Sequence, residues 1–143
     1  MQRVRRASVR VEGAVVGEIA GGLLLFLGVE RGDTESDLEW FVNKAAELRI
    51  FADDEGRMNR SLIDVGGAAL VVSQFTLAAT ISSGRRPSYS RAAAPELAEP
   101  LYELFIERLA ARGVRLQSGR FGAMMDVELV NDGPVTLWIE KPE

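Results

Sequence analysis

Neither cysteine nor histidine occurs among the 143 residues of the chain. The absence of cysteine excludes a disulfide framework, a thiolate metal site and a cysteine nucleophile. The absence of histidine excludes a Ser-His-Asp triad, imidazole acid–base catalysis near neutral pH, and the commonest protein ligand for zinc, copper or iron. Any chemistry must therefore use hydroxyls, carboxylates, guanidinium groups, backbone amides or groups on the substrate.

Long apolar runs are also missing. The run at residues 23–27 is among the longest, and it is far shorter than the roughly 20 residues that a helix needs to cross a bilayer. The N-terminus lacks the residue order of an export signal. We therefore expect a soluble, cytoplasmic protein with no membrane partner.

The length and the 47% hydrophobic content suit one domain, residues 1–143, around a single core. The net charge of -4 is not that of a protein that coats duplexes, so we expect no DNA partner and only local contact with any nucleic acid. Arginine, which suits bidentate phosphate contact, provides most of the cations. Some of the arginines lie in two groups: Arg3, Arg5, Arg6 and Arg10, then Arg85, Arg86 and Arg91. Solvated faces explain these groups equally well.

Hydrophobic periodicity predicts an α/β protein. Alternation of apolar and polar residues, or a short apolar run, predicts strands at residues 7–11, 15–19, 22–29, 68–75, 127–130 and 135–139, the last two joined by a tight turn. Three- and four-residue spacing predicts helices over residues 34–48 and about 96–112, the second ended by Gly113. Pro100 predicts a kink or a later start of that helix. Residues 79–95 are predicted to form a long loop, a common place for function.

Polar side chains end one predicted strand, where Ser73, Gln74 and Thr76 follow an apolar run. A strand end that opens into a loop is a usual place for a ligand, although such residues also satisfy backbone groups at a sheet edge. The segment at residues 131–136 reads as a turn by itself, but its Gly133–Pro134 bond can be cis at modest cost. A cis bond there would bring two carbonyls together with no side chain between them.

Two other segments have a plain and a functional interpretation. Phe121, between two glycines, could stack on a base or lie buried in a turn. Asp53, Asp54 and Glu55 could bind a cation, but they lack the alternating ligands of a calcium loop. We interpret the acidic run as a solvated turn and expect no metal.

Taken together, these segments resemble the D-aminoacyl-tRNA deacylase family over nearly the whole chain. The matching stretches are QRV (residues 2–4), GLLLFLGV (22–29), LRIF (48–51), RMN (57–59), SQFTL (73–77), GRRPSYS (84–90), GRFGA (119–123) and NDGPVT (131–136). The resemblance implies a homodimeric hydrolase, without cofactor, that clears D-amino acids and also glycine from the 3′ end of mischarged tRNA. It further implies a three-layer α/β architecture with mixed sheets and two main helices. The active site would lie at the dimer interface.

The resemblance also assigns roles to residues. Those implied to line the reacting ester are Ser73, Gln74, Phe75 and Thr76. Gly133 and Pro134 of the other subunit would present carbonyls to the α-amino group, and Phe121 would contact the terminal adenine. The remaining implied substrate-binding residues are Asn131, Val135 and Met125. If the amino group and the ester are both fixed, an L side chain would collide with the backbone, whereas glycine, which has no side chain, would be accepted as a substrate.

The missing histidine fits this activity, because an aminoacyl ester is already activated and a ribose 2′-hydroxyl can assist water. Backbone N–H groups near Phe75 and Thr76 would then stabilise the oxyanion. Thr76 is expected to orient groups, with a covalent nucleophile as the alternative. Two other functions remain open: a catalytically silent dimer that binds the tRNA end or a partner, and a general esterase for small D-amino acid esters.

Overall fold

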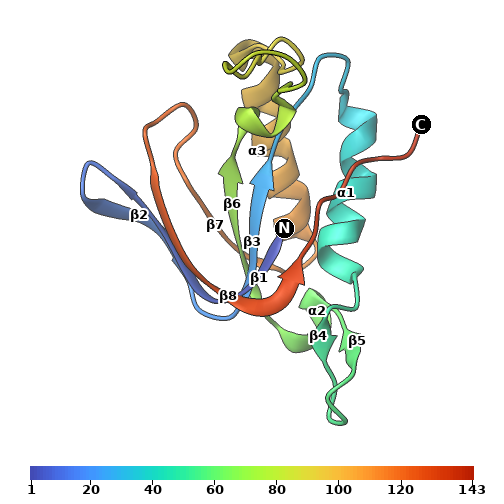
Figure 1. Cartoon of the computed structure of the whole chain (residues 1–143). Helices are drawn as coiled ribbons and strands as arrows, with labels where there is room; N and C mark the ends of the chain where they lie inside the picture. Colours follow the sequence, from blue (N-terminus) through green and yellow to red (C-terminus); the bar gives the residue numbers. More distant parts are fainter.

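The computed structural model describes all 143 residues and shows one six-stranded mixed sheet, a small separate hairpin and two long helices (Figure 1). The strands are β1 (Gln2–Val11), β2 (Ala14–Ile19), β3 (Gly22–Leu27), β4 (Phe51–Ala52), β5 (Met58–Arg60), β6 (Ala68–Ser73), β7 (Arg115–Ser118) and β8 (Asp126–Thr136). The helices are α1 (Glu35–Glu47), α2 (Leu62–Val65) and α3 (Pro95–Ala111), with a 3₁₀ turn, η1 (Phe75–Ala78). None of the helices is long and apolar enough to span a membrane.

The sheet consists of two halves that pack on each other. Strands β3, β6 and β7 run parallel, whereas β1 pairs antiparallel with β2, β3 and β8. One apolar core lies between the parallel strands and helices α1 and α3, and a second joins Val9 of β1 to Leu70 and Val72 of β6. These two cores separate three layers, so the expected three-layer α/β fold is confirmed. The packing is close enough that a Cβ on Gly17 of β2 would lie 2.5 Å from the carbonyl oxygen of Ser118.

Both predicted helices are present. Thr34 is the N-cap of α1, and its backbone N–H donates to the carboxylate of Asp37 at 2.9 Å, which satisfies one end of the capping box. Helix α3 begins at Pro95, where the missing N–H needs no partner, and Gly113 follows its end with φ +88°. Pro100 lies inside α3 on the exposed side, so the alternative of a later start is wrong.

Several strand predictions need correction at their ends. The strand predicted over residues 7–11 begins earlier, at Gln2. The strand predicted over residues 22–29 ends at Leu27, and the one over 68–75 ends at Ser73 because the chain turns into η1. The two final strands, predicted over 127–130 and 135–139, are one strand, β8, which ends at Thr136, so residues 137–139 are not in a strand. Its residues Asn131 and Thr136 pair with Val4 and Gln2, so five steps of β8 oppose two steps of β1. The segment predicted as a tight turn is therefore a large bulge, because pairing with β1 resumes beyond it in the same direction.

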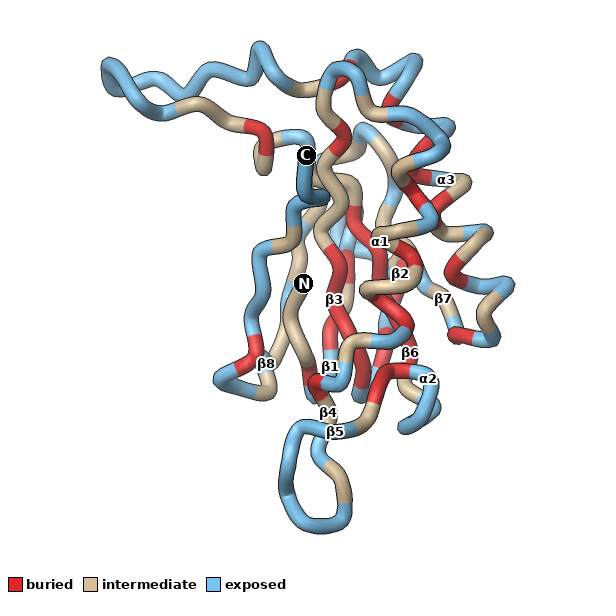
Figure 2. The backbone as a smooth tube through the Cα atoms, turned by 90° about the vertical axis from the view of Figure 1, so that its right-hand side faces the viewer, coloured by how far each residue is buried: buried red, intermediate tan, exposed pale blue.

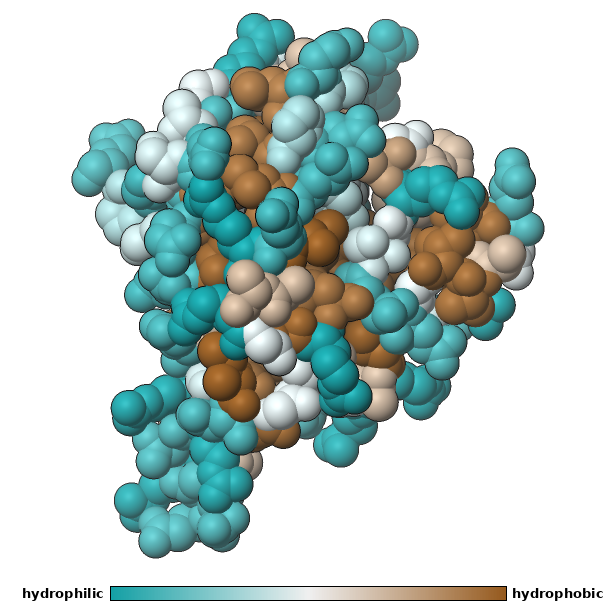
Figure 3. Space-filling view, turned by 180° about the vertical axis from the view of Figure 1, so that it is seen from behind, coloured by the Kyte–Doolittle hydropathy of each residue, from teal (hydrophilic) through white to brown (hydrophobic).

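The acidic run lies in the turn of the β4–β5 hairpin. The Asp53 carboxylate accepts hydrogen bonds from the backbone N–H groups of Arg57 (3.0 Å) and Glu55 (2.9 Å). The backbone hydrogen bond from Arg57 is the main cause that lowers the pKa of Asp53. The hairpin projects at the lower left of Figure 3 and is covered by hydrophilic residues, so the predicted solvated turn is confirmed.

Candidate active site

The SQFTL segment occupies the point where β6 becomes η1. Gln74 ends the pairing with β3, since its backbone N–H donates to the Leu27 carbonyl at 2.9 Å. The Gln74 side-chain amide donates to the Thr76 hydroxyl at 2.5 Å. Ser73, Gln74 and Thr76 are half-buried. The structure therefore brings these predicted residues together, with the hydroxyl of Thr76 fixed by its neighbour.

Two backbone N–H groups of η1 have no acceptor within the chain. The first hydrogen bonds of the turn are donated by Leu77 to the Gln74 carbonyl and by Ala79 to the Thr76 carbonyl. The N–H groups of Phe75 and Thr76 stand at the start of the turn, where no carbonyl of the turn can accept from them. Neither N–H donates to any backbone or side-chain acceptor. Unpaired N–H groups on successive residues can bind an oxyanion, which is the role that the sequence predicted for them.

The side chain of Phe75 is open to solvent. The residue is 55% exposed, although phenylalanine is usually buried. It packs edge-on against Tyr89 with 5.3 Å between the ring centroids. An exposed aromatic pair beside the two free N–H groups gives this strand end an apolar surface for a ligand.

The NDGPVT segment forms the bulge of β8, and its Gly133–Pro134 peptide bond is cis, as expected. Asn131 holds the bulge closed, because its side-chain amide donates to the carbonyls of Arg3 (2.9 Å) and Val135 (3.0 Å). Val135 is buried in the core, so only its main chain can contact a ligand. Asn131 therefore shapes this segment from within.

Arg3 is a site residue that the sequence reasoning did not single out. Its guanidinium donates to the carbonyls of Ile50 (2.6 Å), Asp132 (3.2 Å) and Gly133 (3.4 Å). It also forms an ion pair with the Asp132 carboxylate at 3.1 Å, and its side chain is only 12% exposed. The available signal was the QRV stretch among the matching segments. Arg3 orients the carbonyl that was expected to meet the substrate.

Within one chain, the two motifs lie on different strands, β6 and β8, and at opposite ends of the sheet. Asn131 pairs with Val4, Val4 with Gly22, and Gly22 with Ala68, the first residue of β6. Ser73 is the last residue of β6, five steps further on, a distance of about 16 Å along the strand. Figure 1 shows the same separation, with η1 at the top of the sheet and the bulge of β8 at the bottom.

The residues of the GRFGA region pack mainly on the core. Phe121 is half-buried, with its ring centroid 5.7 Å from that of Tyr102. Tyr102 is buried and donates its hydroxyl to the Val71 carbonyl at 3.0 Å, and burial raises its pKa. Met125 is half-buried against the second core. The structure thus favours the plain interpretation of Phe121, whose partly exposed ring is the part that remains open to a base.

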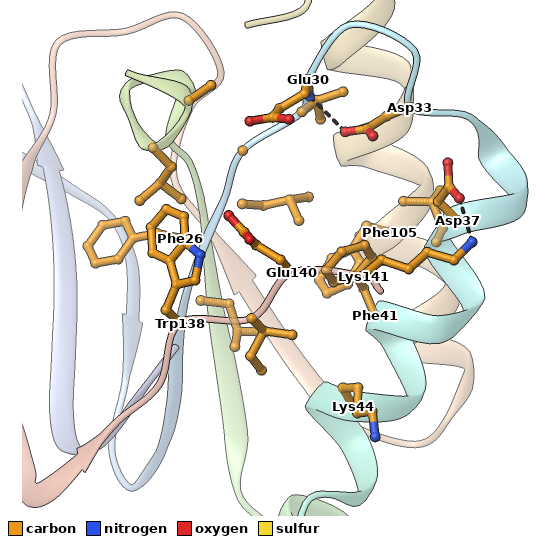
Figure 4. A pocket seen from close by; sticks show the side chains of 18 of the residues that line it. Phe26, Glu30, Asp33, Asp37, Phe41, Lys44, Phe105, Trp138, Glu140 and Lys141 are labelled. Carbon is orange, nitrogen blue, oxygen red and sulfur yellow. Dashed lines mark hydrogen bonds and ion pairs between the residues drawn. The ribbon is translucent and has the colours of Figure 1, made fainter. Parts of the chain in front are cut away.

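A cavity of about 840 Å³ adjoins the end of η1 (Figure 4). Leu77 and Ala78 line it at one end, and the chain beyond β8 covers it. Lys141 in that covering segment reaches Asp37 of α1 at 2.6 Å, and this contact lowers the pKa of Asp37. None of the predicted ester-lining residues faces the cavity.

Comparison with known proteins assigns the chain to one family. The family model described as D-Tyr-tRNA(Tyr) deacylase matches residues 1–140. The D-aminoacyl-tRNA deacylase of Thermomicrobium roseum is 56% identical over 143 residues, which cover 100% of this chain and 93% of the relative. That of Roseiflexus castenholzii is 59% identical over 140 residues, 98% of this chain and 89% of the relative. The chain belongs to the D-aminoacyl-tRNA deacylase family, and it is an enzyme, a hydrolase.

Solved structures agree on the fold. The structure titled c-Myc DNA Unwinding Element Binding Protein is 40% identical with a TM-score of 0.92, and the match covers 99% of this chain and 97% of that one. A probable eukaryotic D-amino acid tRNA deacylase has a TM-score of 0.77 at 20% identity over 93% of this chain and 92% of that one. The second likeness concerns the fold alone.

Proposed function

We propose that the protein hydrolyses the ester bond of D-aminoacyl-tRNA, including glycyl-tRNA mischarged on tRNA-Ala, and rejects L-aminoacyl-tRNA. The observation that carries the proposal is the pair of unpartnered N–H groups at Phe75 and Thr76, beside the hydrogen-bonded Gln74 and Thr76 side chains. Such donors suit the oxyanion of an acyl-transfer reaction. Family membership names the ester on which they act.

The complete site is proposed to form between two copies of the chain. The free N–H groups follow the end of β6, whereas Gly133 lies in β8 at the level where β6 begins, so the two are too far apart to hold one amino acid. A two-fold axis that brings the bulge of one protomer to η1 of its partner would create two identical sites. We therefore expect a homodimer that binds the aminoacylated 3′ end of tRNA in the cytoplasm.

The reaction proceeds by attack of water on the ester carbonyl. The carbonyl oxygen becomes an oxyanion that accepts hydrogen bonds from Phe75 and Thr76 N–H, each worth about 3–4 kcal/mol in comparable enzymes. The intermediate then expels the ribose 3′ oxygen, which takes up the proton lost by the water. The adjacent 2′-hydroxyl assists this proton transfer, so no side-chain base is required, and the hydroxyl of Thr76 orients the reacting groups.

Chirality is proposed to follow from two fixed points. The carbonyls of Gly133 and Pro134 hold the α-ammonium group, and η1 holds the ester. Only one direction from the α-carbon then remains open, and a D side chain takes it. Glycine has no side chain to reject, so glycyl-tRNA is cleaved as well.

Replacing the Thr76 hydroxyl should test its role. In Thr76→Val we expect kcat to fall by about 10- to 100-fold without loss of folding, because one hydrogen bond of about 1.4–2.7 kcal/mol in the transition state disappears. Single-turnover hydrolysis of D-aminoacyl-tRNA measures the effect. An undetectable rate, together with a trapped acyl ester on Thr76 of the parent, would instead identify a covalent nucleophile.

Chelation should leave the activity unchanged. No group of three or more carboxylates in the structure lies close enough to hold a metal ion, and the Asp53 carboxylate is occupied by backbone N–H groups. We expect the same rate before and after exhaustive treatment with EDTA. Loss of turnover that one divalent ion restores would show that a metal takes part.

The proposed function is tested by matched D-, L- and glycyl-tRNA substrates. We expect the pure protein to release amino acid from D-aminoacyl-tRNA and glycyl-tRNA but not from L-aminoacyl-tRNA. Binding without cleavage would favour the silent dimer. Equal rates for tRNA esters and for small D-amino acid esters would favour the general esterase.

A further inference from the structure

The loop after η1 forms an arm that stands away from the body of the protein. Thr80 and Ser88 close it with two backbone hydrogen bonds, of 2.8 and 2.9 Å, and every residue from 81 to 91 is exposed. Figure 2 shows this excursion at the upper left, extending far beyond the sheet and helices. We call residues 80–88 the arginine arm, because its tip carries Arg85 and Arg86.

The positive charge of the arm is not neutralised by the protein. Arg85 and Arg86 take part in no ion pair or hydrogen bond, and the arm contains no acidic residue. The arginine that follows the arm differs, since Arg91 pairs with Glu30 at 2.6 Å. In a chain of net charge -4, a projecting segment with two free guanidinium groups is a local site for an anion. Serine hydroxyls of the arm, at positions 82 and 83, add further donors.

The arm is joined directly to the candidate active site. It begins two residues after η1 ends at Ala78. On its other side, Tyr89 follows the arm and packs against Phe75, the residue that supplies one of the free N–H groups. A chain of nucleotides whose terminal ester lies at η1 must therefore leave the site close to this loop.

We propose that the arginine arm binds phosphates of the single-stranded 3′ end of the tRNA substrate. The proposal rests on the proposed function, and it assigns to the arm the affinity for RNA that the ester-binding residues do not provide. Arginine matches a phosphate with two parallel hydrogen bonds, and a small exposed loop can follow a flexible strand. A rigid duplex is a poorer fit, since only two cations lie at the tip.

The test compares a long and a short substrate in one double variant. For Arg85→Ala/Arg86→Ala we expect KM for D-aminoacyl-tRNA to rise by about tenfold and kcat to stay within about twofold. The slope of log KM against log salt concentration should fall by about 1.4, because two single-strand phosphate contacts are lost. With the D-aminoacyl ester of adenosine, which has no phosphate, both constants should equal those of the parent.

Two matched variants serve as controls. Arg6→Ala/Arg10→Ala removes two exposed, unpaired arginines of β1 and should leave KM for tRNA near the parental value. Arg85→Lys/Arg86→Lys keeps the charge and should recover part of the lost affinity. Competition by deacylated tRNA and by duplex DNA, at the same phosphate concentration, measures whether the arm prefers tRNA to a duplex.

Several outcomes would overturn the inference. An unchanged KM for tRNA in the alanine variant would show that the arm makes no phosphate contact. Equal losses with the adenosine ester would show that the arm only shapes the pocket, and stronger competition by duplex DNA than by tRNA would identify a different partner. If the parent cleaves neither substrate, the proposed function itself fails, and that result is distinct from the other three.

Discussion

Replacing Gly133 by alanine is expected to lower kcat/KM for D-aminoacyl-tRNA by about 100-fold or more while leaving folding intact. Within the chain, an added Cβ would meet only the side-chain oxygen of Asn131, at 3.8 Å, which is an ordinary van der Waals contact. The fold therefore tolerates the methyl group. In the proposed site, the same methyl lies beside the α-carbon of the substrate and displaces its ammonium group from the Gly133 carbonyl.

The matched control is Gly21→Ala, because a Cβ on that exposed glycine would meet nothing within 4 Å. Kinetics and urea unfolding should be measured for both variants. We expect both to unfold at the parental midpoint, and only Gly133→Ala to lose activity towards D-aminoacyl-tRNA and glycyl-tRNA. A Gly133→Ala enzyme with the parental rate and the parental rejection of L-aminoacyl-tRNA would remove the proposed basis of chirality.

Arg3→Gln should reduce both stability and selectivity. The variant loses charge-assisted hydrogen bonds to Ile50 and Asp132 in a nearly buried position, so we expect the free energy of unfolding to fall by about 1–3 kcal/mol. The Gly133 carbonyl loses a donor that orients it. We therefore expect kcat/KM for D-aminoacyl-tRNA to fall by about tenfold and the ratio of D to L cleavage to decrease.

The control for this variant is Arg5→Gln. Arg5 contacts the same Asp132 carboxylate at 3.3 Å, but its side chain is 70% exposed, and such pairs contribute about 0–1 kcal/mol. Its kinetics should match those of the parent. If Arg3→Gln unfolds at a lower urea concentration but keeps the parental ratio of D to L cleavage, Arg3 is only a structural residue.

Local patterns predicted the elements whose causes are local. The alternation of Ala7, Val9 and Val11 gave β1, and the capping residue Thr34 with the spacing that follows gave α1. Short elements were not predicted. Strand β7, for example, is four residues long and half-exposed, and it is stabilised by pairing with β6. The bulge of β8 was not predicted either, because it depends on pairing with β1, which is more than 120 residues away in the chain.

The candidate site also has a part that local sequence predicts and a part that it does not. The motif SQFTL could be recognised because its polar residues follow an apolar strand, yet the 3₁₀ turn that frees the two N–H groups was visible only in the structure. The part played by Arg3 could not be predicted, since its contacts to Ile50, Asp132 and Gly133 join three distant segments. Long-range contacts of this kind leave no periodic signal in the sequence.

A subunit-mixing experiment tests most directly whether each site is shared by two protomers. Gly133→Ala and a second variant that impairs the η1 half of the site, Gln74→Ala/Thr76→Val, are assayed alone and after being unfolded and refolded together in equal amounts. Half of the dimers should be mixed, and each mixed dimer contains one intact site, so activity should return to about one quarter of the parental value. Activity equal to the mean of the two variants alone would contradict the shared site.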